Sequence, residues 1–467
     1  MATENPVRGL DDEATQAFAA QLRGKLIRSG DPDYEEARKV YNAMIDRKPA
    51  LIARCVDVAD VIAAVNFARA QKLAVAVRGG GHSGPGLGVV DDGLVIDLSE
   101  MKGIRIDPKE RTARVEGGCV WGEVDHAAAA FGLATPSGFI SSTGVGGLTL
   151  GGGIGYLSRA LGLTIDNLLG VDMVLADGSF VTASADENPD LFWAVRGGGG
   201  NFGVVTSFLY KLSPISVVYG GPMLWPLDQA QELLPFWRDF ILNAPENING
   251  WFGLATVPPA PPFPAEHHLE KMCLIVWCYT GPLDQAEEAF KPIRAFGSGP
   301  AIDFAGPVPW PALQSLFDAL YPAGLQWYWK ADFFTDLSDK VIDLHTKYGA
   351  QLPTMHSTMH LYPINGAAHR PSSSDTAFSF RDANFAEVIV GVSPDPSDDE
   401  RMIQWARDYW MALHPYSAGG GYINMMMDEG EDNVRAAYRE NYARLAQIKA
   451  KYDPDNLFHV NQNIKPA

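Results

Sequence analysis

Hydrophobic residues in the first 212 positions form short runs that alternate with stretches of helical spacing. Residues 51–55 are apolar and predict a buried strand, and residues 58–71 place Ala and Val on one face of a helix. Residues 104–107 and 113–116 alternate between apolar and polar side chains, which is typical of a hairpin. Helices are also predicted at 11–26, 33–45 and 121–131, and strands at 95–98, 170–175, 180–183 and 201–212. This mixture indicates an α+β domain spanning residues 1–212.

The pattern changes after residue 212, where Pro214, Pro222 and Pro226 mark a junction. Strands are predicted at 250–257, 271–279, 326–333, 354–361 and 385–392, with helices at 229–242, 282–296, 337–349 and 397–413. Strands separated by helices in this way predict one antiparallel sheet covered on one face, in a second domain at residues 213–418.

Two glycine-rich stretches interrupt the first domain. Arg78-Gly79-Gly80-Gly81-His82-Ser83-Gly84-Pro85-Gly86 lies between the apolar runs 73–77 and 94–98, and the second stretch occupies residues 136–159. Consecutive glycines let the main chain approach a ligand closely, and their exposed N–H groups form anion sites. Because every glycine loses backbone entropy on folding, two such stretches favour a long ligand held by main-chain amides over simple linkers.

Several motifs together resemble one family of flavoproteins. They are Arg78-x-Gly80-Gly81-His82-Ser83, the stretch from Gly138 to Arg159, Gly162-Leu163-x-x-Asp166-Asn167, Trp193-Ala194-Val195-Arg196-Gly197-Gly198-Gly199, Tyr422-Ile423-Asn424 and Tyr452-Asp453-Pro454-Asp455-Asn456. The chain is similar over nearly its whole length to berberine-bridge-enzyme-like FAD oxidases of the vanillyl-alcohol-oxidase/PCMH superfamily, with a 6-hydroxynicotine-oxidase-like layout. The resemblance implies a PCMH-type FAD-binding domain plus a substrate domain, with residues 419–467 returning to the FAD domain.

The resemblance also implies which residues hold the flavin. His82 would carry it covalently through the 8α-methyl group of the isoalloxazine, although a lone turn histidine usually only binds a backbone carbonyl. The remaining residues implied in FAD binding are Arg78, Gly79, Gly80, Gly81, Ser83, Gly138, Ser142, Thr143, Gly144, Gly146, Gly147, Gly152, Gly155, Val204, Tyr422, Asn424, Asn461 and Gln462. Asn461 and Gln462 would meet the flavin pyrimidine edge, or else belong to a polar surface tail.

Two positions beside the implied flavin depart from many relatives. Ile140 stands where many relatives attach the flavin a second time through cysteine, and isoleucine forms no thioether, so attachment through His82 only (monocovalent) is expected. Thr143 stands where many oxidases carry a valine that shapes the oxygen pocket. Two interpretations are open. The Thr143 hydroxyl donates to O2 or to flavin N5, or it bonds to the backbone as in an ordinary loop.

The acid/base groups common in these relatives are absent. Met425 replaces the second tyrosine of Tyr-x-Asn-Tyr, and a loose alignment puts Ile389 at the Gln or Glu position of a sheet strand. Either the base has moved, with Tyr422, His356 or His360 as candidates and Lys330 as a cationic aid, or the substrate, such as a neutral amine, needs little help from a base. By the period of two in strands, Tyr328 and Lys330 share one face of the strand at 326–333, and Trp327 and Trp329 share its other face. His356, Thr358 and His360 share one face of the strand at 354–361. For each of these a structural role is the simpler interpretation.

These features predict an FAD-dependent oxidase that moves hydride from a small apolar or aromatic alcohol or amine to flavin N5 and is reoxidised by O2 to H2O2. An oligosaccharide oxidase and an FAD-dependent dehydrogenase are the alternatives, and a non-catalytic flavin-binding protein is a remote one.

Composition narrows the partners and the compartment. The formal charge of −19 argues against nucleic acid and anionic membranes, which bind Lys/Arg patches. No apolar run is long enough to span a bilayer, and residues 1–23 lack the apolar core of a signal peptide. The four cysteines lack zinc spacing and are expected as buried thiols, which favours a cytoplasmic protein. The sequence leaves monomer and dimer open.

Overall fold

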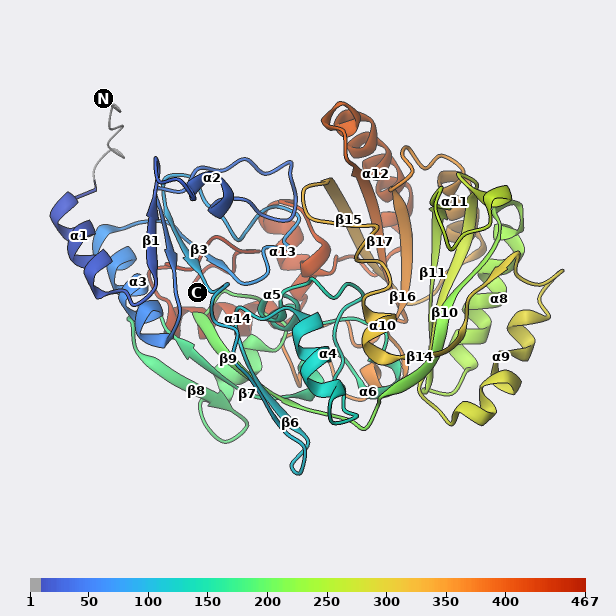
Figure 1. Cartoon of the computed structure of the whole chain (residues 1–467), viewed down its shortest axis with the longest axis horizontal. Coiled ribbons are helices and arrows are strands. Elements are labelled where there is room, and N and C mark those ends of the chain that lie inside the picture. The colour runs from blue at the N-terminus through green and yellow to red at the C-terminus, as the bar shows by residue number, and fades with distance from the viewer. Residues whose placement is uncertain (1–9) are drawn as a thin grey trace.

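The computed structural model describes residues 10–467, in which three sheets organise the chain (Figure 1). The part of the predicted polar N-terminus at residues 1–9 lies outside the described residues. A four-stranded sheet has the order β1-β2-β4-β3, and a five-stranded antiparallel sheet has the order β5-β6-β9-β7-β8. Their strands are β1 (Lys25–Arg28), β2 (Leu51–Arg54), β3 (Val75–Arg78), β4 (Leu94–Asp97), β5 (Ile104–Asp107), β6 (Thr112–Glu116), β7 (Leu168–Val174), β8 (Phe180–Ser184) and β9 (Val204–Lys211).

The third sheet lies on the right of Figure 1 and is built from residues 217–393. Its order is β13-β10-β12-β11-β16-β17-β15, with β14 paired to β10, and its pairs are antiparallel. Its strands are β10 (Val217–Pro226), β11 (Ile248–Thr256), β12 (Lys271–Tyr279), β13 (Ile302–Asp303), β14 (Gly306–Pro309), β15 (Gln326–Phe334), β16 (Thr358–Pro363) and β17 (Phe385–Ser393). We call it the large sheet.

Helices cover one face of the large sheet, as the sequence pattern predicts. They are α8 (Ala230–Asn243), α9 (Ala286–Arg294), α11 (Asp339–Gly349) and α12 (Asp399–Leu413). Alternate strand residues such as Phe252, Ile275 and Ile389 pack against these helices in one buried cluster. Residues of the opposite period, such as Leu274 and Val388, face a second cluster that includes Ile154 and Leu163 from the first part of the chain. The uncovered face of the large sheet is therefore turned toward the two smaller sheets.

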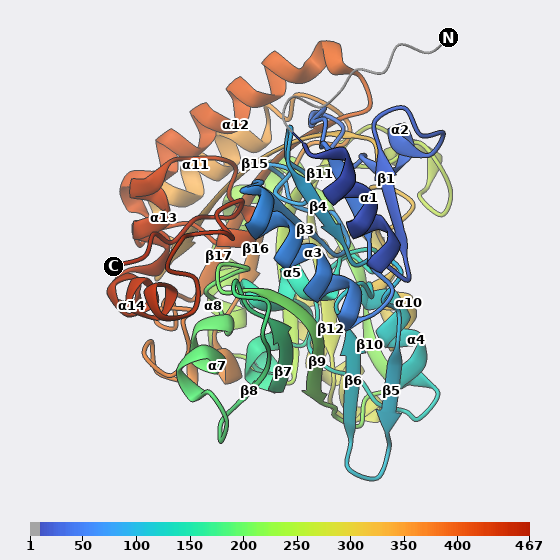
Figure 2. The ribbon, with the colours of Figure 1, turned by 90° about the vertical axis from the view of Figure 1, so that its left-hand side faces the viewer.

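The C-terminal residues return to the smaller sheets. Figures 1 and 2 both place α13 (Glu431–Tyr438) and α14 (Asn441–Tyr452) beside them. Leu445 and Ile448 of α14 share a buried cluster with Trp193 of α7 (Pro189–Val195) and Phe208 of β9. Within residues 10–467, no helix has the length and apolar character needed to cross a membrane.

Two helices predicted near the N-terminus are shorter in the structure. The one expected at 11–26 ends at Gln21, as α1 (Asp12–Gln21), and residues 25–28 form β1 instead. The backbone N–H groups of Arg23 and Gly24 donate to the buried carboxylate of Asp60 at 2.8 and 2.9 Å. These bonds stop the helix, because they take N–H groups that a continuing helix would use.

The helix expected at 33–45 is reduced to α2 (Tyr34–Ala37). The following segment is held by tertiary hydrogen bonds: the Tyr41 N–H donates to the Gly81 carbonyl at 3.0 Å, and Asn42 Nδ2 donates to Gly84 and Trp327 carbonyls at 2.7 and 3.0 Å. Asn42 thus links the first glycine-rich loop to the large sheet, which no local propensity could indicate.

A buried carboxyl group joins the two halves of the molecule. Asp125 on α4 (Trp121–Ala129) accepts the indole N–H of Trp310 on α10 (Trp310–Gln314) at 2.8 Å. Its second oxygen has no partner among the described residues. Burial raises the pKa of Asp125 to about 7, so the neutral acid is the stable form below that pH.

Asp125→Asn should remove a pH dependence of stability. The pKa of Asp125 is higher in the native than in the unfolded protein. Its contribution to the free energy of unfolding is therefore complete below about pH 4 and is lost as the pH rises toward 7, by at most roughly 4 kcal/mol. Unfolding midpoints of wild type should therefore fall from pH 5 to pH 8 relative to those of Asp125→Asn. Parallel curves for the two proteins would contradict this assignment.

Candidate functional site

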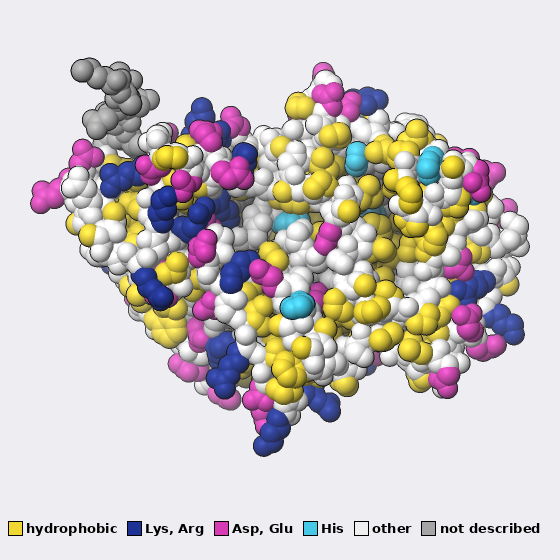
Figure 3. All heavy atoms as spheres, in the orientation of Figure 1, with side chains coloured by type: hydrophobic (Ala, Val, Ile, Leu, Met, Phe, Trp, Pro, Cys, Tyr) yellow, Lys and Arg dark blue, Asp and Glu magenta, His cyan; other side chains and the backbone are white. Residues whose placement is uncertain are grey.

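A cavity of about 940 Å³ lies between the glycine-rich loops and the uncovered face of the large sheet. Figure 3 shows the surface hollowed between the two halves of the molecule. One wall consists mainly of backbone from residues 79–83, 143–147 and 199–203, and the other includes side chains from β10, β11, β12, β15, β16 and β17. The cavity therefore joins a main-chain cradle to an apolar chamber.

The first loop begins where β3 ends. The Arg78 guanidinium pairs with the buried Asp97 carboxylate of β4 at 2.8 Å, which fixes the start of the loop. Gly81 has a φ of 67°, a conformation that a side chain would strain. The backbone N–H groups of Gly80, Gly81 and His82 donate to no other group in the described chain. Free amides in such a loop suit the pyrophosphate of FAD.

The second loop approaches the first so closely that neither has room for a side chain. A Cβ on Gly80 would lie 2.5 Å from Gly144 Cα, and a Cβ on Gly144 would lie 2.4 Å from the Gly80 nitrogen. By contrast, a Cβ on Gly147 of α5 (Val145–Leu150) would meet nothing within 4 Å, although Gly147 lines the cavity. The open space beside Gly147 leaves room for a ligand. The glycines that border it therefore fit the FAD expected from the sequence.

His82 lies in the cavity wall between the two loops. Its ring stacks on Tyr41, with centroids 3.7 Å apart, and its Nε2 is 3.0 Å from Ser142 Oγ. Burial lowers the pKa of His82 to about 3, so the imidazole is neutral. Since Nε2 is engaged by Ser142, Nδ1 is the nitrogen available to a ligand.

Polar groups gather where the C-terminal segment meets the cavity. The Tyr422 hydroxyl accepts hydrogen bonds from the Gly153 N–H at 3.0 Å and from Asn424 Nδ2 at 2.9 Å. The side-chain NH2 groups of Asn461 and Gln462 donate to backbone carbonyls, and their oxygens accept no bond from the described residues. Asn461 and Gln462 therefore present acceptors to the cavity, which suits the N3–H of a flavin ring.

Ile140 and Thr143 both line the cavity. The Thr143 hydroxyl makes no hydrogen bond within the described chain, which favours the interpretation that it faces a ligand over that of a loop residue bonded to the backbone. Cysteines 55, 119, 273 and 278 are buried free thiols, and none lines the cavity.

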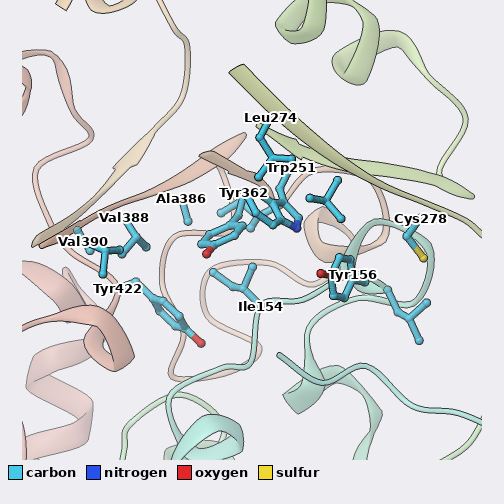
Figure 4. Close-up of a cluster of buried hydrophobic side chains, with 14 of the residues drawn as sticks. Ile154, Tyr156, Trp251, Leu274, Cys278, Tyr362, Ala386, Val388, Val390 and Tyr422 are labelled. Carbon is cyan, nitrogen blue, oxygen red and sulfur yellow. The ribbon is translucent and has the colours of Figure 1, made fainter. Parts of the chain in front are cut away.

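The large sheet contributes the opposite wall. Its side chains at the cavity include Trp327, Trp329, Thr358, His360, Tyr362, Val388 and Val390 from β15, β16 and β17, and Leu224, Trp251, Thr256 and Leu274 from β10, β11 and β12. Figure 4 shows Tyr362 and Trp251 of the sheet facing Ile154 and Tyr422 across the apolar interior. Among residues 10–467, no Asp, Glu or Lys lines the cavity, and Arg78 is the single arginine that does.

The structure does not bring every candidate to the cavity. Lys330 lies on the helix-covered face, where its Nζ is 2.8 Å from Glu429 and 4.4 Å from the centre of the Trp410 ring. His356 precedes β16, outside the cavity. Ile389 faces the helices, so Val388 and Val390 hold the cavity positions of β17.

Four implied FAD residues also lie behind the lining. Ser142 contacts His82, as described above, but is not in the wall itself. Gly152 packs against Phe378, and a Cβ on Gly155 would lie 1.8 Å from the Ser137 carbonyl oxygen, while Val204 is fully buried. Among the described residues, no three His, Cys, Asp or Glu side chains are grouped to hold a metal ion.

Comparison with known proteins identifies the family of the chain. Residues 49–184 match the family model of an FAD binding domain, and residues 421–465 match the model described as berberine and berberine like. An FAD-linked oxidoreductase of Dictyostelium discoideum is 32% identical over 458 residues, covering 96% of both chains.

Solved structures agree as well. The structure of 6-hydroxy-D-nicotine oxidase from Arthrobacter nicotinovorans has a TM-score of 0.84 at 26% identity, covering 96% of this chain and 98% of that chain. A chitooligosaccharide oxidase has a TM-score of 0.82 at 26% identity, covering 97% and 100%. The fold is thus a PCMH-type FAD-binding domain with a substrate domain, as the sequence predicts. The chain belongs to the berberine-bridge-enzyme-like family of FAD-linked oxidoreductases.

Proposed function

We propose that this enzyme is an oxidase of a small, uncharged alcohol or amine with an apolar or aromatic body, and that O2 regenerates its flavin with release of H2O2. The observation that carries the proposal is the absence of Asp, Glu and Lys from the cavity lining, together with the indole and aliphatic side chains on the large sheet. A charged substrate would lose its hydration in such a chamber without gaining a partner.

We assign residues 1–212 and 419–467 to FAD binding and residues 213–418 to the substrate. The loop amides after Arg78 would hold the pyrophosphate, and Asn461 and Gln462 the pyrimidine edge. When bound, the flavin supplies a hydride acceptor. We place its covalent attachment at His82 Nδ1 alone, because Ile140 forms no thioether and none of the cysteines lines the cavity.

An oligosaccharide oxidase is the second candidate, because a chitooligosaccharide oxidase shares the fold at similar identity. Sugars need several hydrogen-bonding side chains on the wall that receives them. In the described chain, the large-sheet side of the cavity offers few: Thr256, Thr358, His360 and Tyr362, of which the last three bond to one another, and the unpartnered indole N–H groups of Trp251 and Trp327.

A substrate panel tests the proposal. Anaerobic bleaching of the flavin should be fastest with aromatic or alicyclic alcohols and amines, and slow or absent with chitooligosaccharides and xylooligosaccharides. Peroxide should then appear in proportion to substrate consumed when air is admitted. Faster bleaching by oligosaccharides would favour the second candidate, and a reduced flavin that persists in air would identify a dehydrogenase.

A further inference from the structure

Three polar side chains of β16 form one hydrogen-bonded chain at the cavity wall. The Tyr362 hydroxyl is 2.6 Å from His360 Nδ1, and His360 Nε2 is 3.0 Å from Thr358 Oγ1. Thr358 Oγ1 in turn donates to the Leu254 carbonyl at 2.9 Å. All three residues line the cavity.

This chain of bonds fixes the direction of every hydrogen in it. The single hydroxyl hydrogen of Thr358 is used on Leu254, so Thr358 can only accept, and His360 carries its hydrogen on Nε2. His360 Nδ1 then has no hydrogen and accepts the one of Tyr362. The imidazole is therefore held as a base directly behind a phenol that faces the cavity.

We propose that Tyr362 and His360 form a proton relay that receives the hydroxyl proton of an alcohol substrate. The proposal rests on the function proposed above. The substrate O–H proton passes to Tyr362 Oη while the Tyr362 proton passes to His360 Nδ1, and the carbinol C–H hydrogen leaves with its electron pair to the flavin. The products are a carbonyl compound, an imidazolium and a flavin reduced by two electrons; the imidazolium later returns its proton to solvent.

Packing holds the pair in one position. The Tyr362 ring stacks on Phe139, with centroids 4.1 Å apart and planes 14° from parallel. The His360 ring lies 4.6 Å from Trp251. Figure 4 shows Tyr362 directed from the sheet toward the space that Tyr422 and Ile154 border. Rotamers restricted on both sides keep the hydroxyl in line with Nδ1, which proton transfer requires.

The surroundings keep both groups in the protonation state that the relay needs. The groups that face the pair are aromatic or phenolic: Trp251, Phe139, Tyr156, Tyr321 and Tyr422. Burial lowers the pKa of His360 to about 3 and raises the pKa of Tyr362 well above its ordinary value. The His360 imidazole is a weak base, but it suffices. As hydride leaves, the substrate alcohol becomes a protonated carbonyl compound, whose hydroxyl is a strong acid.

A second histidine–tyrosine pair provides a matched control. His345 Nδ1 is 2.7 Å from the Tyr409 hydroxyl, and both residues are fully buried between α11 and α12. Neither lines the cavity. Tyr362→Phe and Tyr409→Phe each remove one hydroxyl bonded to one imidazole, at a comparable cost of about 1 kcal/mol or somewhat more.

The test measures anaerobic flavin reduction by an alcohol that the wild type oxidises. Tyr362→Phe should slow it at least tenfold, since a positioned base typically contributes 10²–10⁴-fold. Wild-type rates should be flat from pH 5 to 9, whereas rates of Tyr362→Phe should rise with pH because hydroxide must replace the relay. Tyr409→Phe should keep the wild-type rate and profile. A Tyr362→Phe enzyme that keeps the wild-type rate of flavin reduction and the wild-type pH profile would overturn the relay.

A readout that is independent of turnover uses ¹⁵N NMR of the histidines. In wild type the His360 signals should be those of a neutral ring with its hydrogen on Nε2, down to about pH 5, and Tyr362→Phe should shift the Nδ1 signal. A His360 with its hydrogen on Nδ1 would overturn the relay even if Tyr362→Phe failed to fold. A wild type that oxidises no alcohol or amine would instead contradict the proposed function itself.

Discussion

Replacing His82 with alanine should convert a flavin that survives acid precipitation into one that washes away. Wild-type chain should carry the added mass of one FAD after denaturation, and the flavin peptide should contain residue 82. The neutral imidazole, held through Nε2 by Ser142, leaves Nδ1 as the nucleophile for attachment. Mass spectrometry of the intact and digested protein measures both expectations.

His356→Ala is the matched control for this change. His356 is also half-buried, but it lies outside the cavity, so its loss should leave the flavin attached. A colourless wild-type pellet would refute covalent attachment, and a flavin found on a cysteine would refute attachment through His82 alone. Flavin retained by the His82→Ala pellet would refute the role of His82.

The arrangement of sheets and helices follows from the hydrophobic pattern, because period-two strands and amphipathic helices are local signals. The pattern correctly places Trp327 and Trp329 on one face of the strand and Lys330 on the other, and the structure turns the tryptophan face to the cavity. What it could not decide is which face meets the cavity, since the large sheet is buried on both. Lys330 was therefore a reasonable candidate that the structure moves away from the cavity.

The strand predicted at 354–361 does not include Tyr362, whereas β16 continues to Pro363. The signal was nevertheless present: Thr358, His360 and Tyr362 follow a period of two, which places them on one face of a strand. Tyr41 was hidden for a different reason. Its segment has helical spacing, but tertiary hydrogen bonds, among them those to Gly81 and Trp327, hold it beside His82 in a non-helical conformation.

Gly80→Ala and Gly144→Ala should both separate the two flavin loops and cause loss of the cofactor. Each new methyl group would lie about 2.5 Å from backbone atoms of the facing loop, and backbone cannot move aside as a flexible side chain can. Overpacking of this kind costs about 1–3 kcal/mol or more. We expect a lower unfolding midpoint and substoichiometric flavin in each variant, measured by calorimetry and by the absorbance ratio of flavin to protein.

Gly147→Ala separates a steric effect on the fold from an effect on the cofactor. Its methyl group would meet no protein atom within 4 Å, and alanine in the helix α5 stabilises it by up to about 1 kcal/mol. Without flavin, His82→Ala/Gly147→Ala should therefore be as stable as flavin-free His82→Ala or more so, yet FAD should bind it more weakly, because the open space beside Gly147 is the space we assign to FAD. Titration of the His82→Ala/Gly147→Ala protein with FAD, compared with His82→Ala alone, measures this difference without the covalent bond. Equal affinities would show that the cofactor does not occupy the space beside Gly147.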